Sequence, residues 1–327
     1  MAADPGAAAE HGEPYQGLRP YQEQDKDKFF GRDADCQILI DKILANKLTL
    51  LFAASGVGKS SLLQAAVLPR LKDPRQENLD AVYYLDWISP PLAGLKQAVL
   101  DYLKAQNRLE ADTPLQDLEQ STLKEFFDFC TLFTRHPLVI ILDQFEEFFR
   151  YQRYAADFKL FIQQLATVIT DKGIAVAVVI SMREDFALEL NAFKPQLPTP
   201  LFENFYRLER LTKENARIAI ETPVKRLGFR YEEPLITELL NDLAVREVSQ
   251  YSANPIGEFI DAVEPAYLQI ICSQLWELDR RDRDKTLRYE TYQGKGRDKG
   301  LVQKTSARCS TPFQGTSKNW PPWPSTI

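Results

Sequence analysis

Histidine, methionine and cysteine are scarce in this 327-residue chain, which holds two, two and four of them. The cysteines stand far apart, and neither C-x-x-C nor H-x-x-x-H spacing occurs, which argues against a zinc site and a disulfide scaffold. No apolar run is longer than the seven residues of Ile174–Ile180, whereas a membrane-spanning helix needs about 20. The N-terminus is acidic, unlike a signal peptide. We therefore expect a cytoplasmic protein with no membrane segment.

Charge is unevenly distributed along the chain. The sequence has 40 basic and 46 acidic side chains, a net charge of −6, and 44% hydrophobic residues, enough for a sizeable core. From residue 293 onward there are six basic residues and one acid, a charge of +5, which leaves −11 for residues 1–292. A polar, Gly- and Pro-rich tail of this kind is expected to be disordered. The acidic remainder argues weakly against nucleic-acid binding.

Five short runs between residues 48 and 211 have the composition of strands. The first, third and fourth are nearly continuous apolar runs, as in strands that are covered on both faces of a parallel sheet. Apolar residues from Phe158 to Ile169 keep the spacing of one helix face. This alternation predicts an α/β fold, a parallel sheet with flanking helices. The expected strands are Leu48–Ala54, Ala81–Trp87, Leu138–Asp143, Ile174–Ser181 and Phe205–Leu211.

The pattern changes after Leu211, where we expect the strands to stop and a helical unit to begin. Thr212 provides an N-cap for the first helix, and Pro223 is expected to interrupt or end it. Further helices are expected at Glu233–Arg246 and Pro265–Arg281. The length suggests either two domains or one large α/β domain with an appendage.

The strongest functional motif follows the first expected strand. A glycine-containing loop there leads into Lys-Ser at the start of a helix, which is typical of a phosphate-binding P-loop. Lys59 would reach the β- and γ-phosphates, and the Ser60 hydroxyl would take one position around Mg²⁺. Ala53 replaces the first glycine of the motif, which has a conformational cost only if that position needs a positive φ. The candidate binding residues are Ser55, Gly56, Val57, Gly58, Lys59, Ser60 and Ser61.

A second motif ends the third expected strand. Five apolar residues precede Asp143, whose carboxylate could hold Mg²⁺ through water, and Glu146 or Glu147 could polarise the attacking water. The alternative is a strand end followed by an acidic helix start, where glutamate suits the helix dipole. Together with the P-loop, these residues favour nucleotide hydrolysis.

Two weaker candidates remain open on residue patterns alone. Arg183, which follows Ser181 at the end of a neighbouring strand, could sense the γ-phosphate or be a surface arginine paired with an acid. The segment Phe30, Gly31 and Arg32 could lie against an adenine base. The simpler interpretation of that segment is a helix start with core phenylalanines.

Together these motifs resemble the STAND NTPases, in their novel-STAND branch. The branch-specific stretches are Gly17-Leu-Arg-Pro20 and Phe29-Phe-Gly-Arg32, and the resemblance continues through Tyr206-Arg-Leu-Glu-Arg-Leu211 and Glu264-Pro-Ala-Tyr-Leu-Gln269. It covers roughly residues 14–288. The resemblance implies an AAA+-like and origin-recognition-like sheet in the order 5-1-4-3-2, with a helical lid and a winged-helix unit. It also implies that Phe30, Gly31 and Arg32 form the adenine-side turn.

Composition and the resemblance together predict four regions and a function. The regions are a flexible leader (1–14), a P-loop NTPase domain (15–211), a helical lid with a partial winged-helix unit (212–288) and a disordered basic tail (289–327). Because the winged-helix region does not continue in the tail, we expect a truncated or frame-shifted chain that lacks its sensor repeats. The alternative is a natural short linker and tail. The expected function is an ATP-binding, slowly hydrolysing signal-transduction switch that uses ATP, ADP and Mg²⁺.

The expected partners are further copies of this chain in the ATP state and an unidentified protein effector. Binding of nucleic acid is not expected. Two alternatives stay open. One is an AAA+-like remodeller or DNA-linked ATPase, and the other is a nucleotide-binding interaction module that does not hydrolyse.

Overall fold

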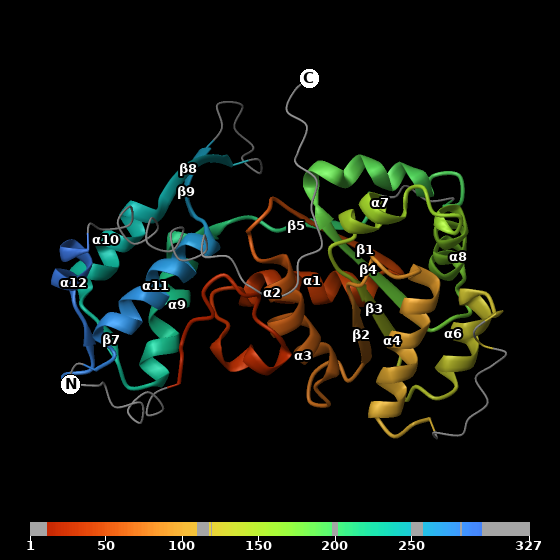
Figure 1. Ribbon diagram of the computed structural model, residues 1–327, viewed down its shortest axis with the longest axis horizontal. Coiled ribbons are helices and arrows are strands. Elements are labelled where there is room, and N and C mark those ends of the chain that lie inside the picture. The colour runs from red at the N-terminus through yellow and green to blue at the C-terminus, as the bar shows by residue number, and fades with distance from the viewer. Residues whose placement is uncertain are drawn as a thin grey trace, which may run out of the picture.

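The computed structural model describes residues 12–109, 118, 120–197, 202–249, 258–281 and 283–295. Figure 1 shows two lobes side by side, a larger one built on a sheet and a smaller, mainly helical one. The N-terminal part of the described chain runs between them. Among the described residues, no helix has both the length and the apolar composition to cross a membrane.

The larger lobe is organised by a sheet of five parallel strands in the order β2-β3-β4-β1-β5. This is the order that the family resemblance implied, read from the other edge. Most of the expected strands are confirmed, with ends that differ by a few residues. The strands are β1 (Leu48–Ala53), β2 (Asp80–Tyr84), β3 (Leu138–Leu142), β4 (Val176–Arg183) and β5 (Phe205–Arg207).

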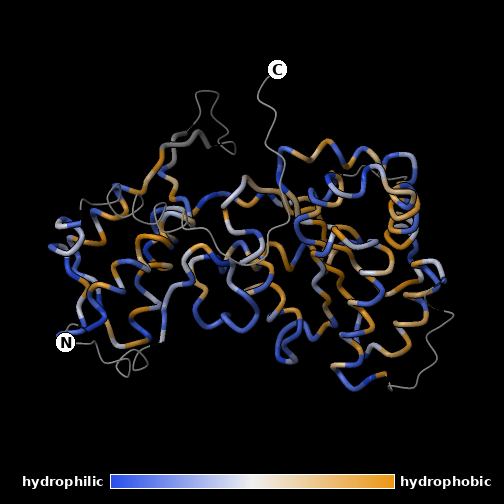
Figure 2. Tube along the Cα trace, in the orientation of Figure 1, coloured by the Kyte–Doolittle hydropathy of each residue, from blue (hydrophilic) through white to orange (hydrophobic). Residues whose placement is uncertain are grey.

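Both faces of the sheet are covered, which explains the continuous apolar runs. Along β1, Leu50 and Phe52 pack into the core on one face, and Leu51 and Ala53 into the core on the other. Figure 2 shows apolar residues concentrated along the strands. One face carries α4 (Pro91–Ala105), α6 (Leu123–Thr131), α7 (Glu146–Gln152) and α8 (Phe158–Thr170). The other carries α1 (Asp33–Ala45), α2 (Lys59–Leu62), a π-helical turn (Leu63–Val67) and α3 (Leu68–Lys72).

The smaller lobe, here called the lid, has its own core of buried apolar residues. Its helices are α9 (Lys213–Arg226), α10 (Glu233–Leu243), α11 (Pro265–Asp279) and α12 (Tyr289–Gly294). The predicted cap of α9 is confirmed, since the Thr212 hydroxyl accepts the Asn215 N–H at 3.2 Å.

Pro223 does not end α9, contrary to the sequence-based expectation. The helix continues to Arg226 because Ala216, Ala219, Ile220, Pro223 and Val224 form one buried stripe against the lid core. The stop comes at Gly228, which has φ +77°. The Phe229 and Gly228 N–H groups donate to the Val224 and Lys225 carbonyls, the hydrogen-bond pattern of a Schellman motif.

The expectation that strands stop after Leu211 was also wrong. The lid contains β6 (Leu211–Thr212), β7 (Arg230–Tyr231), β8 (Ala244–Ser249), β9 (Glu258–Val263) and β10 (Thr286–Leu287). The helix expected at Glu233–Arg246 ends at Leu243, the last residue of its apolar stripe, and the chain then pairs with β9 as an antiparallel strand.

Part of the tail expected to be disordered is helical. Residues 289–294 form α12, because Tyr292 is fully buried in the lid core and its hydroxyl donates to Asp242 Oδ2 at 2.9 Å. The expectation for residues 296–327 lies outside the described residues, as does that for residues 1–11 of the leader.

The N-terminal segment, residues 12–32, contacts both lobes. Tyr15 is buried in the lid core, where its hydroxyl donates to the Ile220 carbonyl at 2.5 Å. Six residues later, the Tyr21 N–H donates to Ser61 Oγ at 3.1 Å, directly after the P-loop. At Gly31, with φ +81°, an added Cβ would come within 2.4 Å of the Asn215 carbonyl oxygen on α9. A glycine is therefore required where this segment meets the lid.

Replacement of Gly31 by alanine should destabilise the protein by about 2–4 kcal/mol, since a strained left-handed φ adds to a backbone clash. Gly228→Ala is the matched control, because its φ is +77° but the nearest atom to an added Cβ is at 3.8 Å. It should cost about 1 kcal/mol. Urea unfolding measures both, and equal losses would contradict the predicted clash.

Candidate nucleotide site

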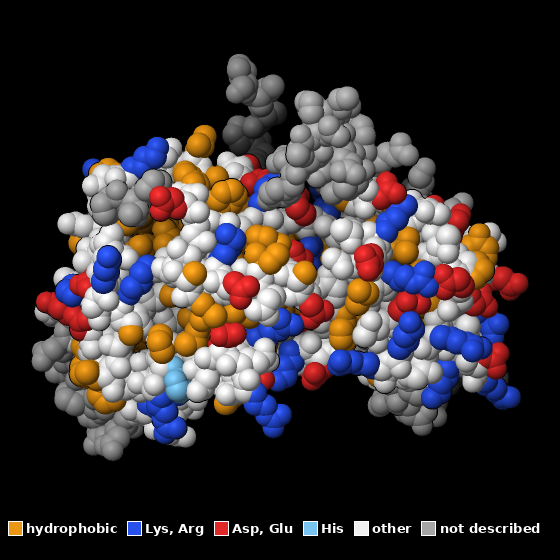
Figure 3. All heavy atoms as spheres, turned by 180° about the vertical axis from the view of Figure 1, so that it is seen from behind, with side chains coloured by type: hydrophobic (Ala, Val, Ile, Leu, Met, Phe, Trp, Pro, Cys, Tyr) orange, Lys and Arg blue, Asp and Glu red, His pale blue; other side chains and the backbone are white. Residues whose placement is uncertain are grey.

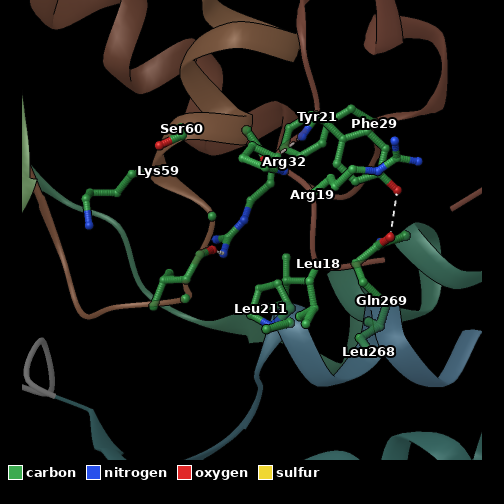
Figure 4. Close-up of a pocket in the computed structure, with 18 of the residues that line it drawn as sticks. Leu18, Arg19, Tyr21, Phe29, Arg32, Lys59, Ser60, Leu211, Leu268 and Gln269 are labelled. Carbon is green, nitrogen blue, oxygen red and sulfur yellow. Dashed lines mark hydrogen bonds between the residues drawn. The ribbon is translucent and has the colours of Figure 1, made fainter. Parts of the chain in front are cut away.

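A cavity of about 400 Å³ lies between the carboxyl end of the sheet, the N-terminal segment and the lid. In Figure 4, Lys59 and Ser60 lie at one side, Tyr21, Phe29 and Gln269 at the other, and Arg32 between them. The sequence-predicted residues that line it are Phe30, Arg32, Ser55, Gly56, Val57, Gly58, Lys59, Ser60, Ser61, Glu146 and Arg183. Gly31, Asp143 and Glu147 are not in the lining.

The predicted P-loop connects β1 to α2 with two glycines in the left-handed region. Gly56 has φ +82° and Gly58 has φ +101°. Ala53, which replaces the first glycine of the motif, ends β1 and is not among the described residues with positive φ. Alanine therefore has no conformational cost there. The loop leaves the sheet and enters the helix as the motif requires, and Lys59, Ser60 and Ser61 at the helix start line the cavity.

Lys59 is 9% exposed although it carries an ammonium group. Its Nζ donates to the Ala53 carbonyl at 3.4 Å, a long contact. Burial lowers the pKa of Lys59, and the carboxylates of Glu146 and Asp143 oppose that shift. An incompletely compensated cation at the base of a loop of backbone N–H groups is suited to an anionic ligand.

Asp143 is fully buried immediately after β3, and only one of its carboxylate oxygens is used. Tyr83 donates to Oδ2 at 2.6 Å, and Oδ1 has no hydrogen-bond partner among the described residues. The neighbouring Ser181 hydroxyl, on β4, is also buried and has no partner in the described part of the chain. Burial beside Asp143 raises the pKa of the Tyr83 phenol. An unsatisfied buried carboxylate oxygen fits a metal-bound water, so the residues present fit Mg²⁺.

The two candidate glutamates are placed differently, although they are adjacent. Glu146 is 6% exposed and lines the cavity, and its Oε2 accepts the Arg183 N–H at 3.1 Å. Burial raises the pKa of Glu146. Glu147 is instead paired with Arg150, Oε1 to Nη1, at 2.7 Å. The geometry therefore brings Glu146 to the phosphate end of the cavity and Glu147 to the surface.

Arg183 lines the cavity but forms a two-pronged ion pair with Asp185. Its Nε donates to Oδ1 at 3.0 Å and its Nη2 to Oδ2 at 2.6 Å. The surface pairing that the sequence left open is thus present. To reach a phosphate, the guanidinium would have to exchange this partner.

The segment expected to lie against adenine has a structural role in this conformation. Arg32 is 6% exposed, and its guanidinium donates to the Val57 carbonyl at 3.1 Å and to Asp35 Oδ2 at 2.9 Å. It therefore ties the start of α1 to the P-loop backbone. The Phe30 ring lies under the Arg226 guanidinium, 4.6 Å from ring centroid to carbon.

Sequence patterns missed the lid side of the cavity. Gln269 on α11 accepts hydrogen bonds at Oε1 from the Tyr21 hydroxyl at 2.9 Å and the Gln16 N–H at 3.2 Å. Glu264, just before α11, lies so close to the P-loop that its Oε1 would be 3.3 Å from a Cβ on Gly56. The apolar residues at helical spacing in α11 predict only that this helix has a buried face. The polar contacts depend on how the lobes meet.

This combination of sheet order, loop and buried acid defines the class of P-loop NTPases, and solved structures agree with that fold. A Walker-type ATPase of Pyrococcus abyssi, PABY2304, is 14% identical with a TM-score of 0.54, over 89% of this chain and 75% of that one. The ORC2 protein of Aeropyrum pernix, solved in ADPNP–ADP complexes, is 14% identical with a TM-score of 0.55, over 91% and 72%. The ORC1 protein of the same organism, solved with DNA, is 14% identical with a TM-score of 0.52, over 86% and 66%.

Sequence comparison identifies the family. The Novel STAND NTPase 1 family matches residues 14–320. Because this is most of the chain, the protein belongs to that family. The match continues past residue 288, where the resemblance was expected to end. No curated protein matches the sequence.

The raised pKa of Glu146 predicts how stability depends on pH. A carboxyl whose pKa is raised in the folded state destabilises the fold once it ionises, so its cost appears as pH rises through that pKa. In nucleotide-free protein, Glu146→Gln should be more stable than the natural protein near pH 7, and the difference should shrink toward pH ~4.5. Urea unfolding at both pH values measures this.

Glu147→Gln is the matched control, one residue away and ion-paired at the surface. It should change stability by less than about 1 kcal/mol. A Glu146→Gln protein that is less stable than the natural one by the same amount at both pH values would contradict the prediction.

Proposed function

We propose that this protein is an ATP-driven signal-transduction switch of the STAND type that hydrolyses ATP slowly with Mg²⁺. The observation that supports this best is the cavity, which is lined jointly by the P-loop, the N-terminal segment and the lid. A nucleotide bound there would contact all three at once. The phosphate state could thus change how the lid sits on the P-loop domain.

Each step has a residue suited to it. The P-loop N–H groups and Lys59 would bind the phosphates, and burial of the ammonium strengthens its interaction with them. Ser60 and Asp143 would hold Mg²⁺, which would neutralise charge that develops on the phosphates. Glu146 would polarise the attacking water and receive a proton from it. Arg183 would report the γ-phosphate by leaving Asp185, and Glu147 remains the second candidate base.

The contact between Glu264 and Gly56 suits a resting, closed state. An acid from the lid lies against the phosphate-binding loop and is 3.9 Å from Arg210 Nε. A bound polyphosphate would repel this carboxylate. Phosphate binding and lid position would therefore be coupled, as a switch requires. Oligomerisation of the ATP state, a protein effector and a cytoplasmic location belong to the same proposal.

The open alternative is an AAA+-like ATPase that acts on DNA, since the similar ORC1 protein was solved with DNA. Figure 3 shows basic and acidic side chains interspersed over the face that it views, whereas a DNA-binding face is expected to carry a basic stripe. The mixed charge of this face favours the switch.

Lys59→Ala should weaken ATP binding by about 10- to 100-fold, because one charge-assisted hydrogen bond to phosphate is lost. Calorimetric titration with ATP and Mg²⁺ measures the affinity. Lys104→Ala, at an exposed position on α4 outside the cavity lining, is the control and should bind normally. Unchanged affinity in Lys59→Ala would remove the basis of the proposed site.

Glu146→Gln should lower the single-turnover rate of ATP hydrolysis by about 10²–10⁴-fold while ATP affinity stays within threefold. Glu147→Gln should stay close to the natural rate, because its side chain is paired with Arg150 outside the cavity lining. The reverse order would make Glu147 the base. If the natural protein forms no ADP, it is a non-hydrolysing module. Turnover stimulated severalfold by duplex DNA would favour the AAA+-like alternative.

A further inference from the structure

Gln144 has an unusual backbone conformation at the phosphate end of the cavity. It lies between Asp143 and Phe145 with φ +52°, in the left-handed region that glycine and asparagine tolerate best. The other described residues that have a positive φ and are not glycine are Asn78, Asn107 and Lys285. None of these three lines the cavity.

The neighbours of Gln144 fix its conformation. Asp143 and Phe145 are both fully buried. The Asp143 N–H donates to the Tyr84 carbonyl at 2.9 Å, and the Trp87 indole donates to the Asp143 carbonyl at 2.7 Å. On the other side, the Phe145 N–H donates to the Ser181 carbonyl at 2.9 Å. Two adjacent strands thus hold the flanking residues inward, which leaves Gln144 as the exposed residue of the turn.

The turn places Gln144 in the lining of the cavity, together with Lys59, Ser60, Glu146 and Arg183. Gln144 adds a neutral carboxamide to this group of charged and hydroxyl side chains. A carboxamide accepts a hydrogen bond at its oxygen and donates two at its nitrogen. It can therefore accept a hydrogen from a water while it donates to a phosphate oxygen. Lys59 has no acceptor for the water hydrogen, and Glu146 as a carboxylate has no donor for the phosphate oxygen. A strained residue at such a place points to function.

We propose that Gln144 orients the attacking water of ATP hydrolysis, an inference that rests on the proposed function above. The carboxamide oxygen accepts one water hydrogen, and its N–H₂ group donates to an oxygen of the γ-phosphate. The water oxygen bonds to the γ-phosphorus as the bond from that phosphorus to the β–γ bridging oxygen breaks. ADP leaves with the electron pair, and the water proton passes to the Glu146 carboxylate.

The test is Gln144→Gly, which removes the carboxamide and relieves the strained φ. The single-turnover rate should fall about 10²-fold, as for loss of one transition-state donor, while ATP affinity stays within threefold. The melting temperature should be unchanged or higher. Asn107→Gly is the matched control, with the same φ of +52° at the end of α4. It should hydrolyse at the natural rate.

A second variant tests the amide N–H₂ donor separately from the size of the side chain. Gln144→Glu keeps the length of the side chain but loses the N–H₂ donor, so it should be as slow as Gln144→Gly. Full activity in Gln144→Glu, or a natural rate in Gln144→Gly with intact ATP binding, would overturn the role of Gln144 and leave the proposed function standing. Absence of hydrolysis in the natural protein would overturn both.

Discussion

The site depends on charges that are buried before any ligand binds. Lys59 is 9% exposed and Glu146 is 6% exposed. Burial lowers the pKa of Lys59 and raises the pKa of Glu146, so it favours the neutral form of each side chain. Removal of an ion from water is costly unless partners compensate. Here the compensating partners are few and their contacts are long, such as the 3.4 Å hydrogen bond from Lys59 to the Ala53 carbonyl. A polyphosphate and its metal would supply what the fold leaves unsatisfied.

The N-terminal segment extends this dependence to the lid. Tyr15 is part of the lid core, Tyr21 is bonded to Ser61, and Arg32 holds the Val57 carbonyl. The same stretch of chain therefore contacts the lid, the cavity and the P-loop. A movement of the lid would displace Tyr15, and the N-terminal segment would transmit this displacement to the P-loop. In the proposed switch, nucleotide state and lid position would be linked by the covalent chain as well as by the shared cavity.

The sequence predicted the sheet and the loop that follows β1 well because both depend on local patterns. A buried strand must be apolar on both faces, and a P-loop needs its residues in fixed order, so Leu48–Ala53 and Lys59 could be found directly. The lid was harder. Pro223 was expected to stop a helix, but tertiary packing of its stripe carried the helix through to Gly228. The pairing of β8 with β9 was also missed, although Asn254, Pro255 and Gly257 in the segment between these strands are typical turn residues.

The lid side of the cavity and the backbone of Gln144 could not be predicted for a different reason. Gln269 accepts a hydrogen bond from Tyr21, which lies 248 residues earlier in the sequence, and no spacing rule predicts that contact. The positive φ of Gln144 arises because Tyr84, Trp87 and Ser181 hold its neighbours. Glutamine carries no preference for such a φ, so only the folded surroundings impose it.

Comparison of two buried aspartates shows why burial alone does not identify a site. Asp80, at the opposite end of the sheet, is 2% exposed, yet Arg108 Nη1 reaches it at 2.6 Å and the Tyr102 hydroxyl at 2.7 Å. Burial alone would raise the pKa of Asp80, but these hydrogen bonds lower it overall. That carboxylate is fully satisfied by the protein and has a structural role.

Asp143 is buried even more completely, at 0% exposure, but within the part of the chain that the structure describes, neither its Oδ1 nor the Ser181 hydroxyl beside it has a hydrogen-bond partner. An unsatisfied buried acceptor costs about 1–3 kcal/mol. A fold that satisfies Asp80 at one end of its sheet has the means to satisfy Asp143 at the other. The unsatisfied oxygen therefore supports the proposed metal-binding role of Asp143 independently of the sequence motif.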